Sequence, residues 1–108
     1  MSSRSDVVLV INKSVEQKLI DKLPILNGKT ILNRVDRRIE EEGQVLYYWE
    51  SYNKWSSYCG DSGIIENFVY ENKKDSFLKI IYEDSSVSEY LDDHFDVRVV
   101  SVFRFNGK

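Results

Sequence analysis

The side chains with the most evident capacity for chemistry gather around position 94. His94 is the only histidine, and an imidazole can act as a general base near neutral pH. Six carboxylates lie between positions 83 and 96: Glu83, Asp84, Glu89, Asp92, Asp93 and Asp96. A small enzyme or ligand-binding domain that uses His94 and nearby carboxylates is therefore one hypothesis. It lacks a nucleophile, because Cys59 precedes Gly60 without the flanking residues of an activated thiol. We predict that the chain is not an enzyme and has no catalytic residue.

The same carboxylates have two further interpretations. Carboxylate oxygens suit Ca²⁺ or Mg²⁺, but the Asp-x-Asp-x-Asp-Gly order and distal Glu of a calcium loop are absent. The five glycines form no phosphate-binding loop, so we expect neither a metal nor a cofactor. The segment is predicted to be a solvated polar loop or a surface for a partner with a basic face. In the second case Glu89, Asp92 and Asp93 would contact that partner, and binding would weaken with salt.

A dense aromatic block offers a second kind of recognition. Six of the fourteen aromatic residues fall between positions 47 and 58. In a strand, alternate residues face opposite sides, so Tyr47 and Trp49 are expected to share the core face. The residues predicted to carry a recognition surface are Tyr48, Tyr52, Trp55 and Tyr58. A stacking platform for single-stranded nucleic acid would interleave basic residues, and the block contains only Lys54. A protein partner is therefore favoured over nucleic acid.

Composition limits the class of protein. The chain has 108 residues, a formal net charge of −3 and a single cysteine, which excludes an internal disulfide. A general nucleic-acid binder would be basic, whereas this balance is mildly acidic. No apolar run reaches the roughly 18 residues of a membrane span. We expect one domain over residues 1–108, located in the cytoplasm without membrane contact.

The first half of the chain predicts one helix and three strands. Residues 7–11 form a continuous apolar run typical of a buried strand. Ser14 is a good N-cap, with Gln17 as its capping-box partner, for a helix that Pro24 ends. Residues 31–42 are read as a strand, because three glutamates at a helix C-terminus would oppose the helix dipole. After a turn at 42–44, residues 45–55 return as a strand with one face formed by Leu46, Tyr48 and Tyr52.

The second half predicts a helix and two further strands. A helix begins near Asp61 or Ser62 and buries a stripe of four residues: Ile64, Ile65, Phe68 and Val69. Residues 77–83 and 97–105 read as strands, and residues 87–95 as a short helix. Residues 1–5 are expected to fray. The predicted fold is α+β, with a mostly antiparallel sheet of about five strands and two main helices. An unpaired edge strand such as 97–105 could form a homodimer by strand addition.

Several of these segments together resemble a known group of proteins. They are the aromatic pairs Tyr48-Trp49 and Lys54-Trp55, the helix face of Ile64 and Phe68, and residues 5–11 and 77–84. In outline they are similar to small accessory proteins encoded by bacteriophages, of the host-takeover or anti-defence type. Anti-CRISPR proteins are the best-known kind. The resemblance implies action in the host cytoplasm but supplies no binding residues.

The leading hypothesis is a small, non-enzymatic, phage-encoded binding protein that inhibits a host defence protein by occupying its surface. The alternative within the same class is a bacterial immunity protein or antitoxin that neutralises a toxin. Both need a recognition surface of exposed aromatics and carboxylates.

Overall fold

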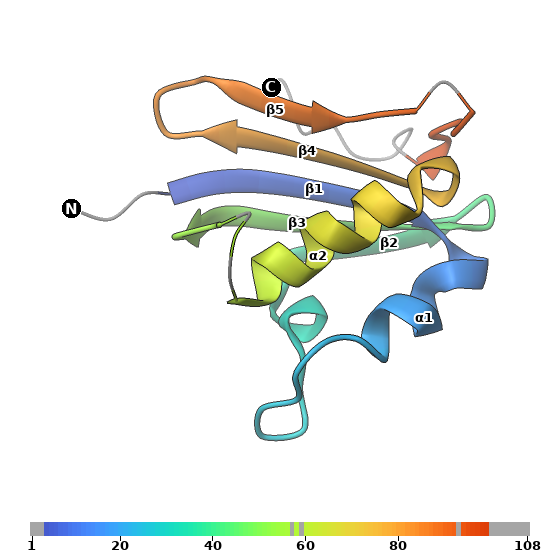
Figure 1. Ribbon diagram of the computed structural model, residues 1–108, viewed down its shortest axis with the longest axis horizontal. Helices are drawn as coiled ribbons and strands as arrows, with labels where there is room; N and C mark the ends of the chain where they lie inside the picture. Colours follow the sequence, from blue (N-terminus) through green and yellow to red (C-terminus); the bar gives the residue numbers. More distant parts are fainter. Residues whose placement is uncertain (1–3, 57, 59, 93, 100–108) are drawn as a thin grey trace.

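The chain folds around a five-stranded sheet. The computed structural model describes residues 4–56, 58, 60–92 and 94–99. The strands are β1 (Arg4–Asn12), β2 (Arg37–Glu41), β3 (Gln44–Asn53), β4 (Ser76–Tyr82) and β5 (Val87–Tyr90). Their order in the sheet is β2-β3-β1-β4-β5, and every neighbouring pair is antiparallel. The predicted α+β class and antiparallel sheet are confirmed (Figure 1).

Two α-helices accompany the sheet within the described residues. They are α1 (Glu16–Ile20) and α2 (Gly60–Glu71), and three short 3₁₀ turns occupy Lys13–Val15 (η1), Ile31–Arg34 (η2) and Lys73–Asp75 (η3). Both helices lie on the same face of the sheet (Figure 1). No helix in the described part of the chain is long and apolar enough to cross a membrane.

The helical face holds the larger hydrophobic core. Val7, Leu9 and Ile11 of β1 are fully buried there, beside Tyr47 and Trp49 of β3. The residues that cover them from the helices are Leu19, Ile65, Phe68 and Val69. The predicted core positions of Tyr47 and Trp49 are therefore confirmed, as is the buried stripe of α2 apart from Ile64, which is only partly buried.

The second face of the sheet is covered by the chain that follows β5. Val8 and Val10 of β1 pack there with Phe95 and Val99. Gln44, which is 1% exposed, holds this segment in place. Its Nε2 donates to the carbonyl of Asp96 at 2.7 Å, and its Oε1 accepts the backbone N–H of Arg98 at 2.8 Å. Residues 97–99 thus pack across the sheet and not as the predicted strand, whose remaining residues lie outside the described part.

A bulge in β3 reverses the expected side of Tyr52. Between the pairs Ser5↔Tyr52 and Val7↔Trp49, β3 contains one residue more than β1. The bulge lies at Ser51, whose φ is 54°. The backbone N–H of Ser51 donates to Asp6 Oδ1 at 2.9 Å. The predicted shared face of Leu46, Tyr48 and Tyr52 is therefore wrong, because Tyr52 packs on the helical face.

Two predictions in the first half are wrong for local reasons. Ser14 caps no helix; η1 comes first, and α1 begins at Glu16, whose side chain is hydrogen-bonded to the sheet. Residues 31–34 form a 3₁₀ turn and not a strand. There the backbone N–H of Thr30 donates to Asn33 Oδ1 at 2.8 Å, and Thr30 Oγ1 accepts the N–H of Leu32 at 3.1 Å.

Two predictions nearer the chain ends also fail. The segment expected as a short helix contains β5, because its residues pair with β4 and complete the sheet. The strand β1 already begins at Arg4, and Ser5 is 4% exposed between its partners Tyr52 and Tyr82. The predicted fraying is therefore wrong for residues 4 and 5, and residues 1–3 lie outside the described part.

The Gln44 contacts predict a measurable stabilisation. Gln44→Leu would remove the two hydrogen bonds to the Asp96 carbonyl and from the Arg98 N–H, so the unfolding free energy should fall by about 2 kcal/mol. Urea denaturation measures this loss. Gln17→Leu is the control, because Gln17 is exposed and should change stability by less than about 0.5 kcal/mol. Equal effects from the two substitutions would contradict the assigned role of Gln44.

Candidate functional site

The four aromatic residues predicted for recognition do not share a surface. Tyr48 lies on the second face of the sheet, whereas Tyr52 and Trp55 pack into the core of the helical face. Trp55 is only 9% exposed, with its ring 5.5 Å from Trp49 and 5.2 Å from Tyr52 between centroids. Tyr58 is 96% exposed. The predicted exposure holds for Tyr58 and is wrong for Trp55, because α2 covers the end of β3.

Tyr48 sits in an acidic environment of its own. Burial raises the pKa of Tyr48 to about 12, and the charges of Asp6, Glu50 and Asp36 add to the shift. Two of these carboxylates are already hydrogen-bonded: Asp36 accepts the N–H of Glu50 at 2.7 Å, and Asp6 accepts the N–H of Ser51. They hold the irregular end of β3, so this cluster is accounted for by the fold.

His94 does not occupy the kind of site that catalysis needs. Its side chain is 72% exposed, and its ring Nδ1 lies 2.8 Å from Asp92 Oδ1. The backbone N–H and the ring of His94 lower the pKa of Asp92. A general base requires a concave, partly desolvated position, which an imidazole so open to solvent lacks. Among the described residues no group of His, Cys, Asp and Glu could hold a metal ion. Cys59 lies outside the described residues.

Two of the predicted acidic residues do meet, in a pocket between α2 and β5. This α2–β5 pocket has a volume of about 290 Å³. It is lined by Val69, Tyr70, Lys73, Glu89, Tyr90, Leu91 and Asp92. Asp93, the third acidic residue predicted to bind a partner, lies outside the described part. The pocket therefore combines the predicted Asp92 with apolar residues that were not singled out from the sequence.

Two large apolar side chains beside this pocket are exposed. Tyr70 is 62% and Leu91 56% exposed. Tyr70 lies on α2 but outside its buried stripe, and that position was a signal available in the sequence. Leu91 follows β5 directly; the sequence placed it in the helical spacing of residues 87–95, a helix that the structure replaces with β5. Together they add the exposed apolar contact area that Tyr48, Tyr52 and Trp55 do not supply.

A buried carboxylate fixes one wall of the pocket. Glu66 of α2 is 5% exposed and accepts the Tyr90 hydroxyl at 2.7 Å through Oε1. Its Oε2 accepts the indole N–H of Trp55, also at 2.7 Å. The carboxylate thus connects the wall residue Tyr90 to the aromatic core. Such charge-assisted bonds are strong, and they hold Tyr90 in one orientation.

A lysine of the protein itself shows which chemistry the pocket accommodates. Lys73 Nζ lies 4.5 Å from the centroid of the Tyr70 ring, a cation–π contact. Asp92 lines the same pocket. Glu89 also borders it, but its side chain points away from α2, because Glu89 pairs with Lys79 and Lys79 with Val8 of the second face; Glu89 Oε2 is 3.8 Å from Lys79 Nζ. An aromatic face, an aliphatic wall and the Asp92 carboxylate form an environment suited to a cation on an aliphatic stem.

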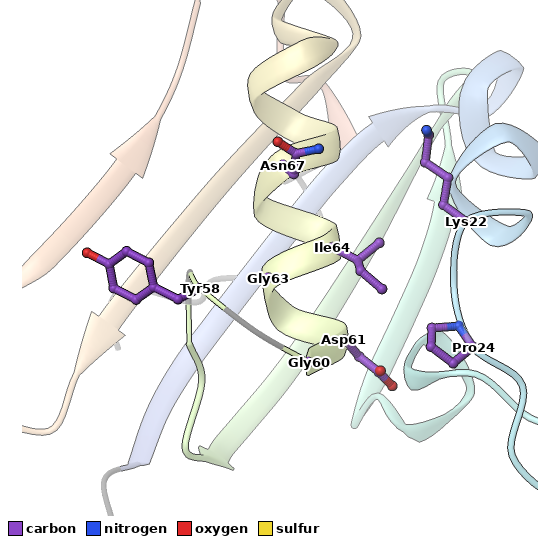
Figure 2. Close-up of a pocket in the computed structure, with 8 residues that line it drawn as sticks. All are labelled: Lys22, Pro24, Tyr58, Gly60, Asp61, Gly63, Ile64 and Asn67. Carbon is purple, nitrogen blue, oxygen red and sulfur yellow. The ribbon is translucent and has the colours of Figure 1, made fainter.

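A larger pocket lies at the N-terminal end of α2, but its lining offers fewer groups that could recognise a ligand. It has about 500 Å³ and is lined by Lys22, Pro24, Tyr58, Gly60, Asp61, Gly63, Ile64 and Asn67. Figure 2 shows the Tyr58 ring directed away from α2 and Ile64. Asp61 places a carboxylate in the first turn and pairs with Arg34 at 3.3 Å. An anion is disfavoured there, and of the predicted residues only Tyr58 is present.

Glu16 is a buried carboxylate that several side chains engage at once. Its carboxylate accepts hydrogen bonds from Lys13 at 2.6 Å, from Arg38 at 3.0 Å and from the hydroxyl of Tyr47. Burial raises the pKa of Glu16, but these three hydrogen bonds outweigh it and hold that pKa at about 2. A carboxylate ionised at every moderate pH and engaged by three donors is a poor proton acceptor. Its role is to attach α1 to the sheet.

This arrangement predicts an acid-sensitive stability. The folded pKa of Glu16 is below its usual 4.5, so its contribution is full above pH 4.5 and is lost as pH falls towards 2. At pH 7, Glu16→Gln should lower the unfolding free energy by about 2 kcal/mol. The difference between wild type and variant should shrink between pH 5 and 2 in denaturation curves. The exposed Glu83→Gln serves as control, and a difference independent of pH would contradict the prediction.

Comparison with known proteins identifies no family for this chain. Neither a protein-family model, nor a curated protein, nor a solved structure matches the chain. What the protein does must therefore be inferred from its own side chains.

Proposed function

We propose that the protein is a non-enzymatic binding protein that acts by occupying a basic surface of a partner protein. The observation that carries this proposal is the α2–β5 pocket, where exposed Tyr70 and Leu91 flank a hollow that Asp92 also lines. In this proposal the pocket receives an Arg or Lys side chain of the partner. The stem would lie against the apolar wall, and the charged head would meet the Asp92 carboxylate.

The apolar residues supply the affinity in this proposal. Burying a side chain such as Leu91 contributes about 1.5–3 kcal/mol, and tyrosine is enriched among the residues that dominate binding energy. Tyr90 is held by Glu66 and Lys73 lies against Tyr70, so part of the pocket is ordered before binding. A preformed site loses less conformational entropy on association.

Negative charge guides the approach of a basic partner in this proposal. With a net charge of −3, the protein as a whole attracts a basic surface, and Asp92 places part of that charge beside the apolar contact. Lys73 opposes this attraction, since it adds a positive charge to the same pocket. The balance predicts an interaction that forms quickly at low salt and weakens as salt increases.

For the partner itself we propose a host defence protein, which the resemblance to phage accessory proteins favours. An immunity protein or antitoxin would use the same surface against a toxin, and co-expression with each partner separates the two. The hypothesis of an enzyme based on His94 is disfavoured by the exposure of that ring.

Substitution of the apolar anchors tests the proposed surface. Tyr70→Ala and Leu91→Ala should each weaken capture of the partner from host lysate about 10-fold or more, because each removes a contact beside the pocket. Tyr58→Ala is the matched control: its ring is also exposed but lies outside the α2–β5 pocket. Tyr70→Ala and Leu91→Ala should both retain wild-type thermal stability. The proposed surface would be refuted if these two variants captured the partner as well as wild type does, or if Tyr58→Ala lost as much capture as they do.

Charge substitutions test the sign of the partner surface. Asp92→Lys should slow association with the captured partner and reduce its dependence on salt, whereas Lys73→Met should speed association. Asp21→Lys, on an exposed position next to α1, changes the net charge as much as Asp92→Lys and controls for it. Surface plasmon resonance over 50–300 mM salt measures these rates. Faster binding by Asp92→Lys would show that the partner surface is acidic.

A further inference from the structure

The strand β2 forms one edge of the sheet. Among the described residues it pairs with β3 alone, and it is the first strand in the sheet order. Its five residues are all exposed or half-buried, in contrast to the fully buried middle of β1. Backbone groups on the outer side of an edge strand can pair with a further strand.

The hairpin between β2 and β3 decides which backbone groups face that outer side. Glu42 and Gly43 form a two-residue loop with φ of 56° and 74°, and the loop is flanked by the pair Glu41↔Gln44. A loop of this type closes on a hydrogen-bonded pair. The backbone N–H and C=O of Glu41 therefore point to β3.

The outward-facing backbone groups of β2 belong to Arg38 and Glu40. The direction of the N–H and C=O alternates along a strand, so these two residues point away from β3 when Glu41 points towards it. Before β2, the N–H of Asp36 donates to the carbonyl of Tyr48 at 2.8 Å and is not directed outward. The edge thus offers a short segment whose two ends are defined.

The charge of β2 is symmetric about Ile39. Two arginines precede this residue and two glutamates follow it, in the order Arg37-Arg38-Ile39-Glu40-Glu41. When a second copy of β2 runs antiparallel with Ile39 opposite Ile39, Arg37 lies opposite Glu41 and Arg38 opposite Glu40. Charged residues on an edge strand ordinarily prevent pairing, since a neighbouring strand meets unmatched charge. A copy of β2 itself supplies the matching charge at every position.

This register also fits the backbone. Each Arg38–Glu40 pair would exchange two hydrogen bonds, because both residues point their N–H and C=O outward. A shift by two residues keeps that backbone pattern but places Glu40 opposite Glu40, or Arg38 opposite Arg38. The strand β5 at the other edge has one charged residue, Glu89, and its charge selects no register.

We propose that two copies of the chain associate by antiparallel pairing of their β2 strands around Ile39. The two-fold axis is perpendicular to the sheet, so the helical faces of both copies lie on the same side. Ile39 packs beside Leu46 on the second face, and the pairing places the two Ile39 side chains next to each other there. Backbone bonds and this apolar contact supply the affinity, and the charges select the register.

The loop after α1 adds apolar area beside this edge. Figure 1 shows the loop on the β2 side of the sheet, and Ile25 of the loop lines a pocket together with Arg38. Ile25 is 70% and Leu26 67% exposed. The two-fold axis brings the loops of both copies to the same face, where these side chains can contact the second copy. Because the paired strands are short, the dimer is weak and depends on concentration.

The dimer leaves the α2–β5 pocket accessible. The strands β2 and β5 are opposite edges of the sheet, so the joined sheet carries one pocket near each end. The inference does not rest on the proposed function. With both in place, one dimer engages two copies of the partner, and the second contact increases the apparent affinity for an immobilised partner.

Two charge substitutions test the register. A homodimer of Arg37→Glu opposes glutamates at both ends of the paired segment, and a homodimer of Glu41→Arg opposes arginines. Each should raise the dimer dissociation constant about 10-fold or more. An equimolar mixture should dimerise as wild type does, since the mixed pair restores opposite charges at both ends. Sedimentation velocity from 10 μM to 1 mM measures this, and the mass of wild type should increase from 12.7 kDa towards twice that value.

A third variant and a control complete the experiment. Glu40→Pro removes an outward N–H while leaving the bonds between β2 and β3, so it should abolish the dimer. Lys74→Glu, at an exposed position on η3, changes the net charge as much as Arg37→Glu and should dimerise as wild type does. Thermal melts establish that each variant is folded.

The outcomes separate this inference from the proposed function. A wild type that stays monomeric up to 1 mM overturns the dimer. A dimer that Arg37→Glu leaves unchanged, or a mixture that stays monomeric, overturns the pairing through β2. In each of these cases loss of partner capture by Leu91→Ala would still support the pocket. Conversely, a mixture that dimerises while Leu91→Ala captures the partner normally would support the dimer and refute the proposed function.

Discussion

Burial of β1 on both of its faces is the constraint on which the rest of the structure depends. Residues from Val7 to Ile11 are all 1% exposed or less, and both edges of β1 are paired, with β3 and β4. A strand with consecutive apolar residues needs cover above and below the sheet. In a chain of 108 residues that cover takes most of the available elements: the helices on one face, and the segment containing Phe95 and Val99 on the other.

This constraint explains why most of the aromatic block serves the core. The β1 residues on the helical face leave a wide apolar surface, and Tyr47, Trp49, Tyr52 and Trp55 fill it beside α2. The polar tips of these rings then need partners in the interior. Glu16 accepts the Tyr47 hydroxyl and Glu66 accepts the Trp55 indole N–H. The two buried glutamates are thus consequences of an aromatic core, and one of them also orders the pocket through Tyr90.

The parts that could be predicted from the sequence are those decided by local pattern. Three features were readable from a single local pattern each: the apolar run at 7–11, the buried stripe of α2 and the alternation around Trp49. The structure agrees with them. The side of Tyr52 was not predictable, because a single extra residue at Ser51 reverses the alternation. Nor was β5, whose residues have helical spacing and become a strand only by pairing with β4. For the site, charge identified Asp92, whereas the direction of Glu89 and the exposure of Leu91 depend on the pairing of β5 with β4, which the helical spacing concealed.

The same constraint decides where recognition can occur. Since both faces of the central strand are covered, recognition is left to the periphery of the fold, at the rim of α2 beside β5. A peripheral site is small, so it gains specificity only if its side chains are held in place before contact. Glu66 and Lys73 meet this requirement, because they restrain Tyr90 and Tyr70 in the pocket.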